Sequence, residues 1–222
     1  MTRAARIGGR FVLMLAVLYA LLLWLGVAVT SWLRHRWPVA DEDAVNRSLV
    51  DNHSAFLDRI TDVLTRLGGV AVVAVTTAVV ALALRLLLKR WREPLFFVLA
   101  VTGELAVWAL TALAIDRARP DVRHLDTVVL SSFPSGPTGA VTAVCIAAAA
   151  LVAWHVTSRP GRLGSIGLLA GVPLAVGWAA MYRGAAHPTD VAGAYLGAAG
   201  SVSVAGAALL NRRWWGERAD PP

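Results

Sequence analysis

The chain contains a single cysteine, Cys145, and only 16% of its residues are charged. One cysteine excludes a disulfide bond within the chain, and its position inside an apolar segment indicates core packing. The low charge, an apolar fraction of 57% and a mean hydropathy of +0.62 exclude an ordinary soluble domain. Alternation of apolar and polar residues, the pattern of membrane strands, is also missing, because the apolar runs are continuous. The composition therefore predicts an all-α membrane protein.

Six apolar runs reach the length of about 20 residues that a helix needs to cross a bilayer. We expect an all-α, polytopic six-transmembrane helical bundle that forms one domain over residues 1–222. Its many alanines and glycines suit close contact between helices in lipid. The first run is longer than the apolar region of a cleaved signal and lacks the small residues at its end, so we expect a retained membrane helix. The predicted spans are residues 11–33, 68–88, 95–115, 138–157, 164–182 and 190–210.

The basic residues are unevenly distributed over the predicted loops. If the N-terminus is cytoplasmic, the inner segments carry twelve basic and three acidic residues, and the outer segments carry nine arginines and ten acids, Asp190 included. This is the positive-inside distribution. It explains the formal charge of +7 through topology and anionic lipid, so we expect no nucleic-acid partner. The prediction is a multi-pass protein of the plasma membrane, with both termini cytoplasmic and membrane lipids as partners.

Two polar features stand out against this background. In the first outer loop, apolar residues recur at helical spacing over residues 56–67, which predicts an amphipathic helix at the membrane interface, with a plain spacer as the alternative. Glu104 lies near the middle of the third span, where an ionisable group is costly and usually faces the bundle interior. We expect it to hydrogen-bond between helices.

Three polar stretches adjoin the predicted spans, and each has an ordinary structural interpretation. DRARPD at 116–121 holds two arginines that can compensate a helix end. SSFPSGPT at 131–138 begins a helix, where Ser135 or Gly136 can cap and free N–H groups can bind an anion. MYRGAAHPTD at 181–190 leads into the last span. Because the loops after the third and fifth spans open on the same membrane face, the three stretches can meet in space.

Taken together, ARP, SFPSG and YRG…HPTDV resemble the type 2 phosphatidic acid phosphatase (PAP2) family over residues 100–205. The resemblance implies a six-helix membrane enzyme that hydrolyses lipid phosphates, such as phosphatidic acid or polyprenyl diphosphates, at a site on the outer face. It implies no metal or other cofactor. It further implies phosphate contacts from Arg119, Ser135 and Gly136, a weaker contact from Arg183, and an orienting role for Asp190.

The chain departs from the family pattern at the residues that carry out the reaction. The family's lysine and its leaving-group histidine fall on Ala112 and Pro137, and its second arginine and nucleophilic histidine fall on Ala180 and Ala186. His187 matches a second histidine that directly follows the nucleophile in many bacterial members. If the turn is helical, the side chain at 187 points about 100° away from that at 186.

These losses lead to the functional prediction. We expect a PAP2-type protein whose hydrolysis is impaired or lost, with binding of lipid phosphate as its residual role. Two alternatives stay open. One is an active lipid phosphatase that uses His187 with Asp190 in a rearranged site, and the other is a lipid or solute transporter built on the same bundle.

Overall fold

The computed structural model describes residues 3–52, 54–122 and 131–209, and within these ranges the regular structure is entirely helical. A short π-helical segment, Ala28–Trp32, continues the first helix, and a 3₁₀ turn, Val39–Asp41, precedes the second. The α-helices are α1 (Arg3–Val27), α2 (Glu42–Asp51), α3 (Ala55–Leu67), α4 (Val70–Leu88), α5 (Arg92–Ala114), α6 (Gly136–His155), α7 (Arg159–Tyr182) and α8 (Pro188–Leu209).

Six of the helices, α1 and α4 to α8, are long and apolar enough to cross a membrane. This confirms the predicted six-span bundle. The largest difference is at α1, which begins at Arg3 rather than at residue 11. The next largest is at α7, which begins at Arg159 rather than at residue 164. Pro160 lies in the first turn of that helix, where a missing N–H costs no hydrogen bond, so the helix starts before the proline. Residue 210, the predicted end of the last span, lies outside the described residues.

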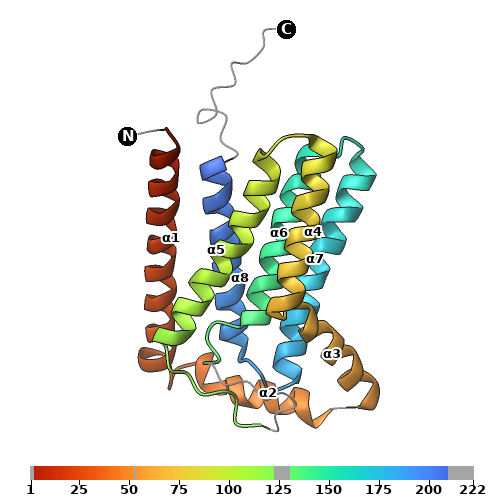
Figure 1. The fold of residues 1–222 in the computed structure, drawn as a ribbon. Helices are drawn as coiled ribbons and strands as arrows, with labels where there is room; N and C mark the ends of the chain where they lie inside the picture. Colours follow the sequence, from red (N-terminus) through yellow and green to blue (C-terminus); the bar gives the residue numbers. More distant parts are fainter. Residues whose placement is uncertain (1–2, 53, 123–130, 210–222) are drawn as a thin grey trace.

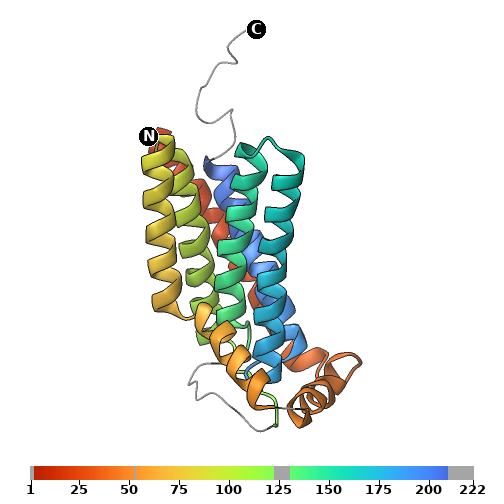
Figure 2. The same ribbon diagram turned by 90° about the vertical axis from the view of Figure 1, so that its right-hand side faces the viewer.

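The bundle has an inner and an outer set of helices (Figures 1 and 2). Half of the most apolar part of α5, α6 and α8 is buried, against 11% for α4, 22% for α1 and 28% for α7. The inner three helices therefore form the core, and the other three present most of their surface to lipid. Side-chain size explains this division. Lipid is as apolar as the helix surface, so helices associate through close packing, and alanine and glycine allow the backbones to approach closely.

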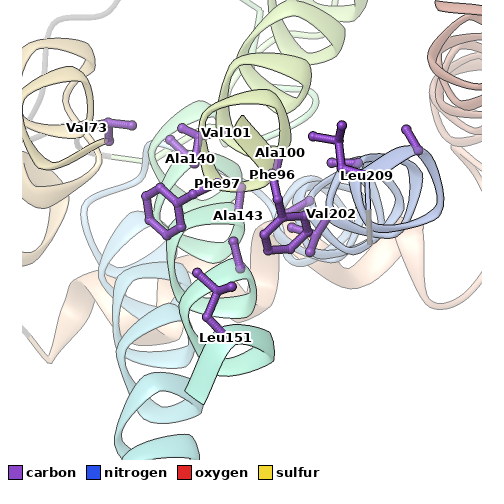
Figure 3. Packing of buried hydrophobic residues seen from close by; sticks show 14 residues of the cluster. Val73, Phe96, Phe97, Ala100, Val101, Ala140, Ala143, Leu151, Val202 and Leu209 are labelled. Atoms are coloured by element: carbon purple, nitrogen blue, oxygen red, sulfur yellow. The ribbon is translucent and has the colours of Figure 1, made fainter. Parts of the chain in front are cut away.

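The core combines large residues on α5 with small ones on its neighbours (Figure 3). Phe96 and Phe97 are 1% and 0% exposed. They pack in one cluster with Ala143 and Ala147 of α6 and with Val202 of α8. The alanines leave room for the two rings, so the three helices pack closely around them.

Glu104 lies within this packed region, as the sequence predicts. It is 1% exposed, and its Oε2 accepts a hydrogen bond from the Ser201 hydroxyl of α8 at 3.1 Å. Its other oxygen lies against Gly139 of α6, and Gly197 of α8 also faces the carboxyl group. The acid thus links α5 to α8 by a hydrogen bond and fills the space that two glycines leave.

The two short helices lie together at one end of the bundle, at the bottom of Figure 1. The start of α1 and the end of α8 lie at the opposite end. The amphipathic helix predicted over 56–67 is confirmed as α3, and its buried Thr61 lies on the side that packs against α7. The end that carries α2 and α3 is called the α2–α3 end below. The candidate site lies there.

Candidate functional site

The three polar stretches singled out in the sequence come together at the α2–α3 end. The backbone N–H of Ser135 donates to the carbonyl of Asp190 at 3.1 Å. The N–H of Ser132 donates to the carbonyl of Arg117 at 3.1 Å, and Arg119 Nη1 donates to the carbonyl of Ala185 at 2.6 Å. These contacts join the segment after α5, the start of α6 and the α7–α8 turn, as the six-span count predicts.

Asp190 is the buried centre of the site, with no exposed surface. It lies in the first turn of α8, where a negative charge is stabilised by the helix dipole. Its Oδ2 accepts from the backbone N–H of His187 at 2.7 Å and lies 3.0 Å from His187 Nδ1. Its Oδ1 accepts a hydrogen bond from Arg117. Asp190 therefore holds both the turn before α8 and the ring of His187.

His187 contacts Asp190. The 100° offset from position 186 was expected only for a helical turn. The residue precedes α8, so the spacing of a regular helix does not apply to it. Its ring is held between two carboxylates: Nδ1 faces Asp190, and Nε2 lies 3.3 Å from Asp43 Oδ1. His187 and Asp190 are thus brought together, with a second carboxyl-bearing residue, Asp43, on the far side of the ring.

Arg117 contacts two buried carboxylates of the site and is absent from the predicted phosphate ligands. Its guanidinium binds Asp190, donates to Glu42 Oε2 at 2.7 Å, and donates to the Thr189 hydroxyl at 2.7 Å. Its side chain is 10% exposed and that of Glu42 is 4% exposed. The sequence marked Arg117 as one of two close arginines, but nothing local identified Glu42 as its partner, because 75 residues separate them.

The predicted phosphate ligands have different surroundings. Arg119 lines the cavity described below and is anchored on the carbonyl of Ala185. Ser135 is buried, and its hydroxyl pairs with that of Thr138 at 2.8 Å. Gly136 begins α6 with the indole of Trp108 against it.

Arg183, the weaker predicted ligand, is directed toward α3. Its Nη1 donates to the carbonyl of Asp58 at 3.2 Å and to the Thr61 hydroxyl at 3.4 Å, and its Nη2 lies 3.7 Å from Asp62. Its side chain is 7% exposed. In this position the guanidinium fastens α3 to the end of α7, and it does not line the cavity beside His187.

The alanines at the family's arginine and nucleophile positions lie in a common apolar cluster. Ala180 and Ala186 are 2% and 1% exposed, and they pack with Val191, Met181 and Tyr195. No side chain at either position reaches a polar group, since each ends in a methyl. The cluster is apolar, and its member Val191 directly follows Asp190 in the chain.

Pro137 lies in the first turn of α6 and away from the cavity described below. It is exposed, and it touches the backbone of Gly68 at the junction of α3 and α4. A side chain at Gly68 would collide with it. The proline thus has a packing role at the α3–α4 junction.

A cavity of about 430 Å³ opens beside these residues. Arg119 and His187 line it, whereas Ala180, Ala186 and Pro137 do not. Its charged lining is mixed, in contrast to the cationic lining of a simple phosphate site. The charged and titratable lining residues are Arg34, Arg117, Arg119, His35, His187, Glu42, Asp43, Asp116 and Asp121. Among the described residues, no group of three or more His, Cys, Asp or Glu side chains is arranged to hold a metal ion.

Comparison with solved structures identifies the fold. The chain superposes on the crystal structure of a transmembrane PAP2-type phosphatidylglycerolphosphate phosphatase from Bacillus subtilis with a TM-score of 0.77, at 17% identity, over 90% of this chain and 98% of that one. It also matches LpxE from Aquifex aeolicus with a TM-score of 0.58, at 20% identity, over 72% of this chain and 92% of that one. No family model and no curated protein matches the sequence. The chain therefore has the fold of the transmembrane PAP2 phosphatases and is a multi-pass membrane protein.

Proposed function

We propose that this chain is a PAP2-fold membrane protein that does not hydrolyse lipid phosphates and instead binds a phosphorylated headgroup in the cavity at its α2–α3 end. The observation that carries the proposal is the apolar packing of Ala180 with Ala186 and Val191. At the two places where the resemblance implies a phosphate clamp and an attacking histidine, the chain has buried methyl groups.

The size of the expected loss supports this conclusion. Removing one member of a nucleophile–base unit costs about 10⁶-fold in a well-studied hydrolase. Losing a general acid costs about 10²–10⁴-fold more where the effects are independent. Pro137 offers no proton, and it is in contact with Gly68 rather than with the cavity.

One observation favours a second candidate, a phosphatase that uses His187 as its nucleophile. The 3.0 Å contact between His187 Nδ1 and Asp190 is the geometry in which a carboxylate orients a reactive imidazole. Attack would then require Nε2 to face phosphorus. Nε2 faces Asp43 instead, at 3.3 Å, and a carboxylate there repels a phosphate dianion. The geometry therefore favours the non-hydrolysing protein.

Phosphate release from purified full-length protein tests the proposal. Phosphatidic acid, a polyprenyl diphosphate and a nonspecific aryl phosphate serve as substrates, and we expect turnover no higher than that of the His187→Ala variant. Turnover that His187→Ala abolishes would establish the second candidate. In that case Asp43→Asn is expected to raise the rate, because it removes the charge facing Nε2.

We further propose that the α2–α3 end lies outside the cell, on the outer face of the plasma membrane, with both termini cytoplasmic. The positive-inside distribution of the basic residues supports this orientation. Residues 210–222, which hold three of the inner arginines, lie outside the described part of the chain.

A further inference from the structure

The carboxylate of Glu42 is buried at the start of α8, although it belongs to a short helix at the edge of the molecule. Glu42 Oε1 accepts from the backbone N–H of Thr189 at 2.7 Å. Glu42 Oε2 accepts from the Thr189 hydroxyl at 3.1 Å and from Arg117 Nη2 at 2.7 Å. The residue is 3% exposed. Both oxygens are thus bound by donors that lie far away in the sequence.

These three donors are of the kinds that bind phosphate and other oxyanions. The N–H of Thr189 lies in the first turn of a 22-residue helix, where it has no partner within the helix and the dipole favours an anion. A hydroxyl adds a neutral donor, and the planar guanidinium of Arg117 adds a charge-assisted one. None of the three belongs to the residues that the resemblance to PAP2 phosphatases implies as phosphate ligands. The donor set therefore forms a separate oxyanion site with a carboxylate already in it.

The site opens into the cavity. Glu42 and Arg117 both line the space of about 430 Å³, together with His187. An anion that enters the cavity can therefore reach the guanidinium from the side where Glu42 now binds it. Arg117 also retains Asp190 as a second partner, so release of Glu42 would not leave the arginine without a counter-charge.

We propose that Thr189 and Arg117 form an oxyanion-binding site whose resident occupant is the Glu42 carboxylate, and that a phosphate-bearing headgroup binds there by displacing Glu42. This rests on the proposed function, in which the cavity binds a phosphorylated headgroup without hydrolysing it. No covalent bond changes in the exchange. A phosphate offers the donors the same kind of oxygen and carries more negative charge than the carboxylate that leaves.

Neutralising position 42 is the direct test. Glu42→Gln removes the resident charge and the repulsion between it and an entering phosphate, and we expect inorganic phosphate to bind at least about tenfold more tightly than to the parent protein, equivalent to about 1.4 kcal/mol. The full chain in phosphatidylcholine nanodiscs is titrated with inorganic phosphate by calorimetry. Nanodiscs that contain a fixed fraction of phosphatidic acid repeat the comparison with the phosphate on a lipid.

Asp43→Asn is the matched control, because it removes one negative charge at the adjacent position of α2. Asp43 also lines the cavity, but its carboxylate lies against the His187 ring, 3.3 Å from Nε2, and not in the donor set of Arg117 and Thr189. We expect its effect on phosphate affinity to be less than about a third of that of Glu42→Gln. Adding Arg117→Gln to Glu42→Gln is expected to abolish the gain.

Three results would overturn the proposal: no gain from Glu42→Gln, an equal gain from Asp43→Asn, or a gain that survives loss of Arg117. Glu42→Ala repeats the measurement with a side chain that cannot hydrogen-bond. A gain in affinity seen with glutamine but not with alanine would come from the glutamine amide and not from loss of the carboxylate. Inorganic phosphate is no substrate, so these outcomes do not depend on hydrolysis. Turnover of a lipid phosphate would contradict the proposed function and leave the displacement of Glu42 to be decided by the titration.

Discussion

Gly136 occupies the first position of α6, with the indole ring of Trp108 directly against it. A methyl group added there would lie 2.6 Å from Trp108 Cε2, closer than carbon atoms approach in folded proteins. The resemblance to PAP2 phosphatases implies a phosphate contact for this glycine, but its packing gives an independent reason for having no side chain. The same glycine also fits the helix start, since Pro137 follows it in the first turn.

We therefore expect Gly136→Ala to destabilise the fold by about 1–3 kcal/mol, the usual cost of overpacking. The midpoint of thermal unfolding in one detergent measures it. Gly164→Ala on α7 is the control, because nothing lies within 4 Å of a methyl group added there. That variant should unfold at the parent temperature or above it, since alanine favours helix by about 1 kcal/mol. Equal midpoints for the two variants would show that Trp108 does not restrict position 136.

At this scale the sequence revealed the residue types but not their partners. Motif spacing identified three site residues, Asp190, His187 and Arg119. In the structure Arg119 and His187 line the cavity, and Asp190 contacts the ring of His187. Glu42 was missed, because the residues around it in the sequence do not indicate that it binds an arginine 75 positions away. Arg183 was assigned toward the phosphate on motif position alone, whereas its direction depends on α3, which packs beside it.

Among the helices, α2 shows how a short polar element can be held in place by buried contacts. Glu42, Asp43 and Asn46 lie on one side of it, and they reach α8, His187 and the α7–α8 turn respectively. Asn46 has no exposed surface, and its Nδ2 donates to the carbonyls of Ala186 at 2.9 Å and Met181 at 3.1 Å. The helix thus covers the turn that contains one of the two buried alanines.

Asn46→Ala should loosen α2 from this turn, because it removes two hydrogen bonds to buried carbonyls, at a cost of about 2–3 kcal/mol. Hydrogen exchange of the backbone amides of residues 42–51 measures it, and we expect clearly faster exchange. Asn52→Ala is the control, since Asn52 is exposed and its amide donates to the carbonyl of Ser48 in the same segment. If both variants exchange alike, Asn46 does not anchor the helix.

The sequence predicted the long helices well and the short ones unevenly. Continuous apolar runs predict all six spans, because crossing a bilayer demands both length and hydrophobicity, and only the starts of the first and fifth spans differ by more than three residues. The amphipathic pattern also predicted α3. The pattern of α2 is weaker and mostly polar, so its position depends on tertiary contacts that no local pattern contains.

Over the whole molecule, the six spans place the start of α1 and the end of α8 at one end, and α2 with α3 at the other. The proposed orientation therefore predicts opposite accessibility for two introduced cysteines, Asp51→Cys on α2 and Arg159→Cys at the start of α7. Both positions are exposed, and the native Cys145 is buried. In intact cells a membrane-impermeant maleimide should label position 51 at once and position 159 only after permeabilisation. The reverse labelling pattern would show that the α2–α3 end faces the cytoplasm and would contradict the proposed orientation.

The carboxyl group of Glu104 has a consequence for how this bundle can change over evolutionary time. It occupies a notch formed by Gly139 and Gly197, so the separation of α5, α6 and α8 is matched to an acid and two absent side chains. A shorter residue at 104 would leave a hole, and a larger one at 139 or 197 would strike the acid. We expect positions 104, 139 and 197 to covary among related sequences, so that a substitution at one of them is accompanied by substitutions at the others.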